Sequence, residues 1–430
     1  MILALLVFIL TYAFISIRRF KKFRIERPAA ALLGAALMVL LAIVTPNEAI
    51  NAVRTHLDTI ILLLGMMMLV IILELCGFFD LISLYIVKHA GSPFRFLVLL
   101  MVIIGTLSAL ILNDTVVLLF TPILIKSCRL IKADPVPYLI AEAFAANIGS
   151  VATPIGNPQN AYIAINAGIS FTTFTAKLFP VAVVCLFIGI IVTWFVFKRD
   201  FIANTDLVVK RFSFLELNWY VFREEMRGQN ENRYKNSING LKNNTSLYLA
   251  LGILIAVFVG FVIVPEMSIV AIIGGCVAIF FIPLLGKVKT RFVLKKIDWG
   301  ILLFFAGLFV VLAGVEKANV FSWFEKEYLQ TTLSLSLVSA ILSNLISNVP
   351  AVMLIASISS YQLSQQLWLV LAASSTLAGN ATILGAAANI IVAEAGSVMG
   401  VEIGFWKFMK AGIIVTVLTL IVSILMLSLI

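Results

Sequence analysis

The sequence predicts an all-α polytopic membrane protein built as an inverted structural repeat with two re-entrant hairpins and two broken transmembrane helices. Of its 430 residues, 62% are hydrophobic and 12% are charged, whereas soluble domains have roughly 45–50% and 25%. Apolar stretches of about 20 residues, the length that crosses a bilayer, recur along the chain. Two further apolar stretches are interrupted by the same spacing of Thr, Gly and Asn. These residues are Thr153, Gly156 and Asn160 in the first, and Thr382, Gly385 and Asn389 in the second.

The net charge of +10 describes topology and not a nucleic-acid partner. Lys and Arg cluster in short segments between apolar runs, where they mark cytoplasmic loops. The four cysteines are isolated, without the spacing of a disulfide framework or a metal site. We therefore expect the lipid bilayer as a partner, no metal and no cofactor.

Full-length spans are predicted at 1–17, 28–46, 58–79, 177–197, 246–264, 268–286, 298–316 and 407–430. The stretches 96–125 and 331–361 are too long for one span and too short for two. A segment that contains polar residues stands at the middle of each, Asn113-Asp114-Thr115 in the first and Ser347-Asn348-Val349-Pro350 in the second. A re-entrant hairpin fits such a length. Broken helices follow at 135–168 and 366–399.

The basic linkers 18–27 and 287–296 are predicted to be cytoplasmic. Counting spans from them places the N- and C-termini outside and the linker 198–245 in the cytoplasm. The first hairpin then enters from the cytoplasm and the second from outside, so 1–197 and 246–430 are repeats of opposite orientation. LILNDTVVLL (110–119) also aligns with LISNVPAVML (345–354). We expect a multi-pass protein of a prokaryotic plasma (inner) membrane, with its first segment retained as a span.

Two hairpin tips and two helix breaks are expected to converge near the bilayer midplane. There the N-terminal ends of half-helices can bind an anion, or a neutral polar molecule, without a buried basic side chain. The predicted substrate- and ion-binding residues are Asn113, Asp114, Thr115, Thr153, Gly156, Asn157, Asn160, Ser347, Asn348, Asn380, Thr382, Gly385 and Asn389.

Asp114 is the leading candidate for proton coupling because an ionisable side chain at this depth is usually functional. Its alternative role is that of a helix cap. Glu142 and Glu394, on the arms of the broken helices, either relay protons or face a water-filled crevice. The coupling ion is expected to be H⁺ or Na⁺.

Four motifs, NDTVVLLFTP (113–122), TPIGNPQN (153–160), SNVPAV (347–352) and GNATILGAAAN (379–389), together resemble the ion transporter superfamily. The chain is most similar to its arsenite-efflux (ArsB-type) and anion-permease branch, which is related to NhaD-type antiporters, the pink-eyed-dilution protein and the divalent anion/sodium symporters. The resemblance implies a scaffold that holds an elevator-like transport domain, and a homodimer. The symporter branch carries Ser-Asn-Thr at both tips, a pattern that only Asn113, Ser347 and Asn348 match here.

The N-D-x-x-x-L-x-x-T-P pattern at 113–122 instead resembles the arsenite-efflux type. We therefore expect a secondary active transporter of a small inorganic anion or oxyanion, first of all arsenite or antimonite efflux coupled to protons. The alternatives are a sodium/proton antiporter or a sodium-coupled carboxylate or sulfate transporter. An enzyme is not expected, because a hydrolase would need a nucleophile and base, or metal ligands, at one depth.

Overall fold

The computed structural model describes residues 1–16, 19–20, 23–24, 26–202, 245–285, 288–320, 329–359 and 363–429. Most of the predicted linker 198–245 lies outside the described residues. Within them, seven helices are long and apolar enough to cross a membrane. The two strands found there form one short antiparallel pair, β1 (Arg19–Phe20) with β2 (Phe23–Arg24). The prediction of an all-helical polytopic membrane protein is confirmed.

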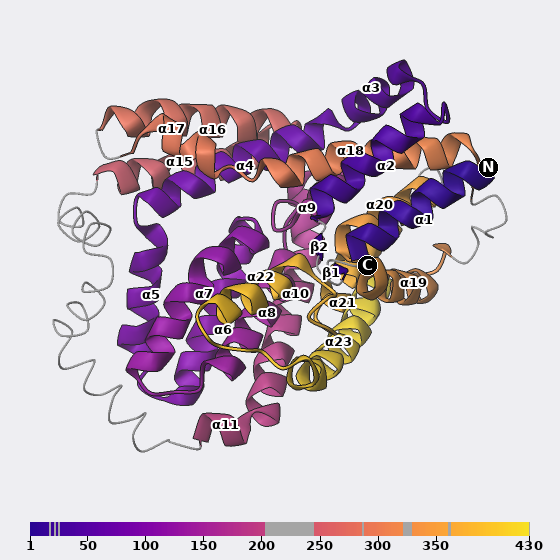
Figure 1. Ribbon diagram of the computed structural model, residues 1–430. Helices are drawn as coiled ribbons and strands as arrows, with labels where there is room; N and C mark the ends of the chain where they lie inside the picture. The colour runs from indigo at the N-terminus through magenta and orange to yellow at the C-terminus, as the bar shows by residue number, and fades with distance from the viewer. Residues whose placement is uncertain are drawn as a thin grey trace.

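The helices fall into two sets along the chain (Figure 1). The first set is α1 (Ile2–Ser16), α2 (Arg27–Leu40), α3 (Pro46–Thr55), α4 (Leu57–Leu75), α5 (Phe78–His89), α6 (Pro93–Leu110), α7 (Asn113–Leu130), α8 (Pro135–Ser150), α9 (Pro158–Asn166), α10 (Phe171–Val196) and α11 (Lys198–Ile202). The second set is α15 (Thr245–Ile263), α16 (Met267–Leu284), α17 (Thr290–Lys296), α18 (Trp299–Lys317), α19 (Thr332–Ile346), α20 (Asn348–Ser359), α21 (Gln365–Ala378), α22 (Ala387–Val398) and α23 (Phe405–Ser428).

Two of the predicted spans end early because the chain turns. In the stretch 28–46 the helix stops at Leu40, and a capping box of Thr45 and Glu48 starts the separate helix α3. In the stretch 58–79 the helix stops at Leu75, and Gly77 turns the chain with a φ of 85°. The helix α5 then lies mostly between the predicted span 58–79 and the predicted hairpin 96–125, where no element was predicted.

One layer is built from α2, α4, α16 and α18, with α1 and α15 packed beside them. Its two main crossings are equivalent, α4 on α16 and α18 on α2, and each depends on a glycine. A Cβ on Gly65 would lie 2.3 Å from the backbone of Ala271, and a Cβ on Gly307 would lie 2.7 Å from the backbone of Ala31. Small residues let the backbones touch, as in many helix pairs within membranes.

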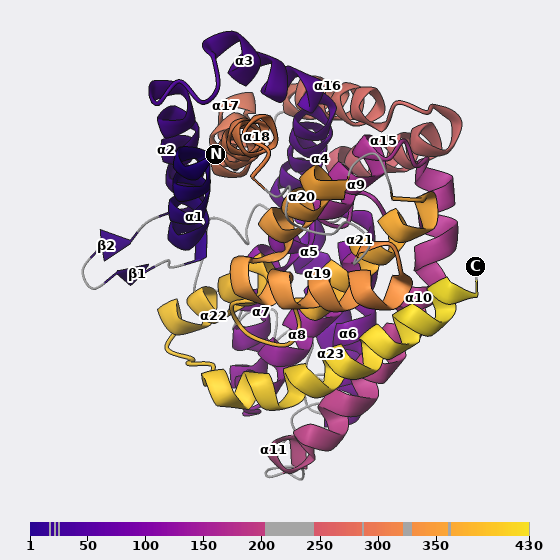
Figure 2. The same ribbon diagram turned by 90° about the vertical axis from the view of Figure 1, so that its right-hand side faces the viewer.

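The second layer contains both hairpins, α6 with α7 and α19 with α20, both interrupted helices and the long helices α10 and α23. Figure 2 shows α19, α21 and α23 below the first layer, with α9 and α20 between them. The packing of α6 on α8 is repeated by α19 on α21, and α10 packs against α23. Gly149 of α8 lies directly on Gly105 of α6, where an added Cβ would approach the Gly105 carbonyl oxygen to 2.1 Å.

Polar bonds at the helix ends join segments that the charge pattern assigns to one side of the membrane. The bonds on the predicted cytoplasmic side are Lys296 to Glu74 (2.5 Å), Lys407 to Asp200 (2.9 Å) and Asp134 (3.5 Å), and Arg129 to the Met399 carbonyl. At the other end, Lys317 pairs with Glu48 at 2.7 Å.

Candidate functional site

The first helix break lies between the end of α8 at Ser150 and the start of α9 at Pro158. Asn157 caps α9, because its side-chain oxygen accepts a bond of 2.8 Å from the Asn160 amide. The Asn160 side chain reaches back and donates to the carbonyls of Ser150 (2.9 Å) and Thr153 (3.2 Å). The backbone groups that the break releases are therefore satisfied by protein, as a break inside a membrane requires.

The second break repeats this arrangement between α21 and α22. Asn389 donates to the carbonyls of Gly379 (2.7 Å) and Thr382 (2.9 Å). The two threonines are also equivalent, since each bonds the first helix of its own hairpin. Thr153 donates to the Ala109 carbonyl of α6, and Thr382 donates to the Asn344 side chain of α19. The repeated Thr and Asn thus hold each break together.

Each hairpin tip is docked into the break of its own repeat. The Asn113 amide donates to the Gly156 carbonyl at 2.9 Å. The side-chain amide of Asn348, oriented with its nitrogen toward the break, donates to the carbonyls of Gly385 (2.8 Å) and Ser375 (3.1 Å). The glycines are required here, because a Cβ on Gly156 would come within 2.3 Å of the Ser150 carbonyl oxygen.

Ser347 makes the second hairpin turn alone, as the only residue between α19 and α20. Its φ of 74° and ψ of 157° belong to a region that is essentially restricted to glycine. Such a conformation costs about 1–3 kcal/mol and is typical of binding sites. The first hairpin turns over two residues, Ile111 and Leu112, without a positive φ.

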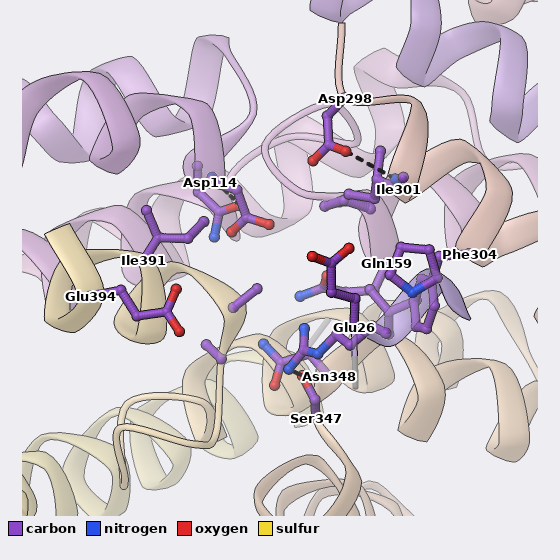
Figure 3. A pocket seen from close by; sticks show the side chains of 18 residues that line it. Glu26, Asp114, Gln159, Asp298, Ile301, Phe304, Ser347, Asn348, Ile391 and Glu394 are labelled. Atoms are coloured by element: carbon purple, nitrogen blue, oxygen red, sulfur yellow. Dashed lines mark hydrogen bonds between the residues drawn. The ribbon is translucent and has the colours of Figure 1, made fainter. Parts of the chain in front are cut away.

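A cavity of 430 Å³ lies where the tips and breaks meet (Figure 3). Its volume is within the range of about 300–1,000 Å³ that small-molecule sites occupy. The described residues that line it are Glu26, Arg27, Pro28, Asn113, Asp114, Pro158, Gln159, Asp298, Gly300, Ile301, Phe304, Ser347, Asn348, Val349, Ala386, Ala387, Ile391 and Glu394.

Most of these residues belong to helix N-termini. The helices α7, α9, α20 and α22 all begin at the cavity, and so do α2 and α18 of the first layer. Each helix start carries a partial positive charge, so their convergence favours negative charge in the cavity.

Three of the four carboxylates that line the cavity also stand at these helix starts. Glu26 and Asp298 occupy N-cap positions, and Asp298 accepts a bond of 3.2 Å from the Ile301 amide. Asp114 lies in the first turn of α7, where its amide donates to the Asn113 side chain. Glu394 is different, because it lies well inside α22. Helix starts are the positions where carboxylates are favourable.

Five residues that the sequence predicts as site or coupling residues line the cavity: Asn113, Asp114, Ser347, Asn348 and Glu394. The remaining predicted binding residues are not among its lining residues: Thr115, Thr153, Gly156, Asn157, Asn160, Asn380, Thr382, Gly385 and Asn389. Eight of these belong to the two breaks, and Thr115 to the first turn of α7.

Glu142 also lies away from the cavity. It is fully buried on α8, facing α7, and accepts a bond of 3.1 Å from Thr121. Its second oxygen has no bonding partner in the part of the chain that the structure describes.

Asn147 is a polar residue that the sequence reading did not select, although an Asn inside the apolar run of α8 could have drawn attention to it. Its side chain is completely buried. Its oxygen accepts from the Asn113 side chain at 3.3 Å, and its nitrogen donates to the side-chain oxygens of Asn380 (3.0 Å) and Asn389 (2.8 Å). Asn147 therefore connects the first hairpin tip to the second helix break.

Thr376 has the equivalent position in the second repeat. It precedes Thr382 by six residues, just as Asn147 precedes Thr153. Its hydroxyl accepts from the side chains of Asn157 and Gln159, each at 3.3 Å. The two repeats are thus bonded to each other in both directions directly behind the cavity.

Arg27 is a second cavity residue that the sequence analysis did not select, since it was assigned only to the basic linker 18–27. It is the one basic side chain among the described residues that line the cavity, and it donates a bond of 3.0 Å to the Ser347 hydroxyl. The basic charge of the site thus comes from α2, outside both hairpins and both breaks.

Duplicated hairpins and interrupted helices around a central cavity define a membrane transporter fold. The comparison with protein families agrees, because the family model described as "Citrate transporter" (CitMHS) matches residues 6–373. The chain belongs to this citrate transporter family, within the ion transporter superfamily.

Its relatives include proteins that are named as a membrane protein and as a transporter. A 46 kDa membrane protein of Mycobacterium leprae is 32% identical, over 97% of this chain and 96% of the relative. A Dictyostelium discoideum protein named as an arsB transporter is 26% identical, over 94% and 87% of the two chains. The human P protein is 27% identical over 90% of this chain, which spans only 55% of that protein. The resemblance to the ArsB-type and anion-permease branch is thereby confirmed.

Proposed function

We propose that the protein is a secondary active transporter of a small oxyanion or carboxylate, which binds in the cavity between the hairpin tips. The observation that carries this proposal is the convergence of the starts of α7, α9, α20 and α22 on one cavity. Helix starts bind anions through their N–H groups without any fixed positive charge. The inverted repeat supports alternating access of the elevator type, in which the hairpin layer moves against the layer of α2, α4, α16 and α18.

The candidate substrates follow from the names of the family and of one relative. The family description suggests citrate, and the arsB relative suggests arsenite or antimonite. A purified-protein thermal-shift screen with citrate, succinate, sulfate, phosphate, arsenite and antimonite distinguishes these classes. We expect an anion to raise the melting temperature; if no anion does so and only sodium does, the proposal is wrong.

Asp114 is proposed to carry the coupling proton. It lies at the tip of the first hairpin, whereas the equivalent position in the second hairpin is Val349. The other ionisable groups lining the cavity are Glu26, Arg27, Asp298 and Glu394, and among these only Glu394 also belongs to the hairpin layer.

The variant Asp114→Asn should lose proton-driven uptake into proteoliposomes while still binding the anion. Asp298→Asn, a carboxylate of the same cavity on the other layer, is the matched control and should keep proton-driven uptake. Full proton-driven uptake by Asp114→Asn removes the assignment.

A sodium/proton antiporter is the second candidate, favoured by the four carboxylates that line the cavity. It predicts sodium flux that follows the pH gradient in the absence of any transported anion.

The proposal further includes the predicted orientation, with both termini outside a prokaryotic plasma membrane and the segment 198–245 inside, and a homodimer. On that orientation the starts of α2 and α18, which line the cavity, lie toward the cytoplasm.

A further inference from the structure

Arg27 occupies a place that a basic residue of ordinary membrane topology would not take. The helix α2 has 14 residues and is therefore about 21 Å long, whereas the hydrocarbon core is about 30 Å thick. Its far end is followed by the exposed pair of Glu48 and Lys317, which marks an aqueous boundary. Arg27, at the near end, is only partly exposed and lines the cavity. An arginine held inside a membrane protein normally has a binding or pairing function.

The neighbours of Arg27 are the parts that bind substrate in the proposed function. Its Nη2 atom donates to the Ser347 hydroxyl at 3.0 Å, and Ser347 is the strained residue at the second hairpin tip. Asn348, the first residue of α20, lines the same cavity. A guanidinium offers five donors in a planar fork that matches the paired oxygens of a carboxylate or oxyanion.

The bond between Arg27 and Ser347 also joins the two layers of the protein, since Arg27 belongs to α2 and Ser347 to the second hairpin. A second bond does the same, from the Tyr12 hydroxyl of α1 to the Pro350 carbonyl of α20 at 3.2 Å. The Tyr12 bond is neutral and Tyr12 does not line the cavity. Variants that remove one bond or the other therefore distinguish the effect of a charge at the cavity from the effect of a contact between the layers.

We propose that Arg27 is a substrate-contacting residue that selects charged anions, and that a bound anion accepts the guanidinium hydrogen bonds in place of Ser347. This inference depends on the proposed function and narrows its substrate class to ions with paired, negatively charged oxygens. Neutral arsenous acid would gain little from Arg27. Binding of the anion would at the same time release the second hairpin tip from α2.

The test compares Arg27→Gln, Arg27→Lys, Tyr12→Phe and Lys296→Gln in proteoliposomes, with citrate, succinate, sulfate and arsenite as substrates. Lys296 carries a positive charge at the same end of the protein but bonds Glu74, away from the cavity. Loss of a hydrogen bond to a charged group corresponds to an increase in KM of about tenfold or more. We expect this increase for Arg27→Gln, a smaller one for Arg27→Lys, and changes below about twofold for Lys296→Gln.

Tyr12→Phe should change the maximal rate rather than KM, because it removes only a contact between the layers. If Arg27→Gln and Tyr12→Phe have the same effect, Arg27 is a structural contact and the inference is wrong. The inference is also wrong if Arg27→Gln transports anions with the same KM as the wild type. The proposed function is unaffected by that result. If no anion is transported by the wild type, the proposed function itself fails.

Discussion

Replacement of Asn147 by Ala tests whether the two repeats depend on each other through their buried amides. The side chain makes three bonds, to Asn113, Asn380 and Asn389. Its removal leaves one donor and two acceptors without that partner in the protein interior. Each buried polar group left unpaired costs about 1–3 kcal/mol, so three groups cost at least about 3 kcal/mol. Whole-protein stability is only about 5–15 kcal/mol, and the loss should therefore be large.

The assay is thermal unfolding of the purified variant, followed by uptake into proteoliposomes. The matched control is Ser375→Ala, because Ser375 is equally buried but its hydroxyl bonds only the Ala372 carbonyl of its own helix. Thr376→Val should lie between the two, since it removes two longer bonds of 3.3 Å. A melting temperature of Asn147→Ala equal to that of Ser375→Ala would refute the reasoning.

Two further predictions concern packing and pH. Gly149→Leu should prevent stable folding, because even a Cβ would lie 2.1 Å from the Gly105 carbonyl oxygen. Gly252→Leu is the control and should be tolerated, because no atom lies within 4 Å of the added Cβ. The measurement is the yield of each purified variant after size-exclusion chromatography. The pKa of Glu48 is lowered from 4.5 to about 2, mainly by its hydrogen bond from Lys317 and then by that from the Thr45 amide. A lowered pKa stabilises the fold above pH 4.5 and loses this contribution as the pH falls toward 2. The difference in melting temperature between the wild type and Glu48→Gln should therefore shrink between pH 5 and pH 3, and a constant difference contradicts the assignment.

The interrupted helices could be predicted from the sequence because the cause of each break is local. Pro154, Gly156 and Pro158 stand within five consecutive residues of an apolar run, and no regular helix accommodates that combination. The hairpins could be predicted for a similar reason, since their length fits neither one span nor two. These features depend on residues that are close together in the chain.

Asn147 and Arg27 could not be assigned in the same way because their partners are distant. Asn147 meets Asn389 across 242 positions, and Arg27 meets Ser347 across 320. A basic residue after a first span also has a sufficient explanation in membrane topology, so nothing in the sequence required a second role for Arg27. The helix ends at Leu40 and Leu75 could not be predicted either, because the turns that follow them contain residues that also occur inside helices.

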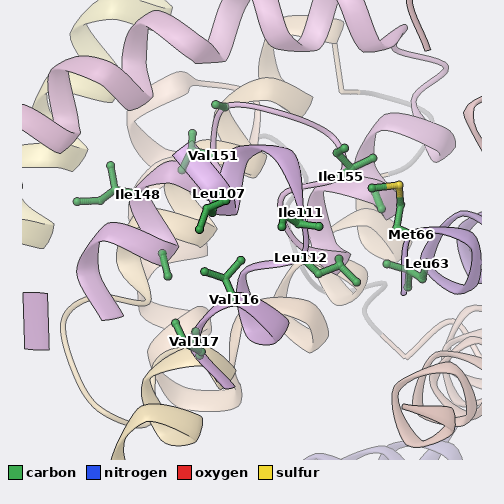
Figure 4. Packing of buried hydrophobic residues seen from close by; sticks show 14 of the residues in the cluster. Leu63, Met66, Leu107, Ile111, Leu112, Val116, Val117, Ile148, Val151 and Ile155 are labelled. Carbon is green, nitrogen blue, oxygen red and sulfur yellow. The ribbon is translucent and has the colours of Figure 1, made fainter. Parts of the chain in front are cut away.

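The two hairpins differ in how they contact the first layer. Around the first hairpin the contact is apolar, with Ile111, Leu112 and Ile155 near Leu63 and Met66 of α4 (Figure 4). Around the second hairpin it is polar, through Arg27 and Tyr12. A hydrophobic surface has no directional bonds to break, whereas the polar one holds the hairpin in a fixed position.

This difference makes the two access states unequal if the opposite-facing state arises when the two repeats exchange their conformations. Ala31 of α2 and Ala271 of α16 have equivalent places at the two glycine crossings, and four residues before each stand Arg27 and Met267. Met267 is apolar and buried, so the exchanged conformation has no arginine at the corresponding position. We infer that Arg27 raises anion affinity only when the cavity opens toward the end of α2 that carries it. Uptake measured separately in inside-out and right-side-out vesicles should then show Arg27→Gln raising KM on one side of the membrane alone, and an equal increase on both sides contradicts the inference.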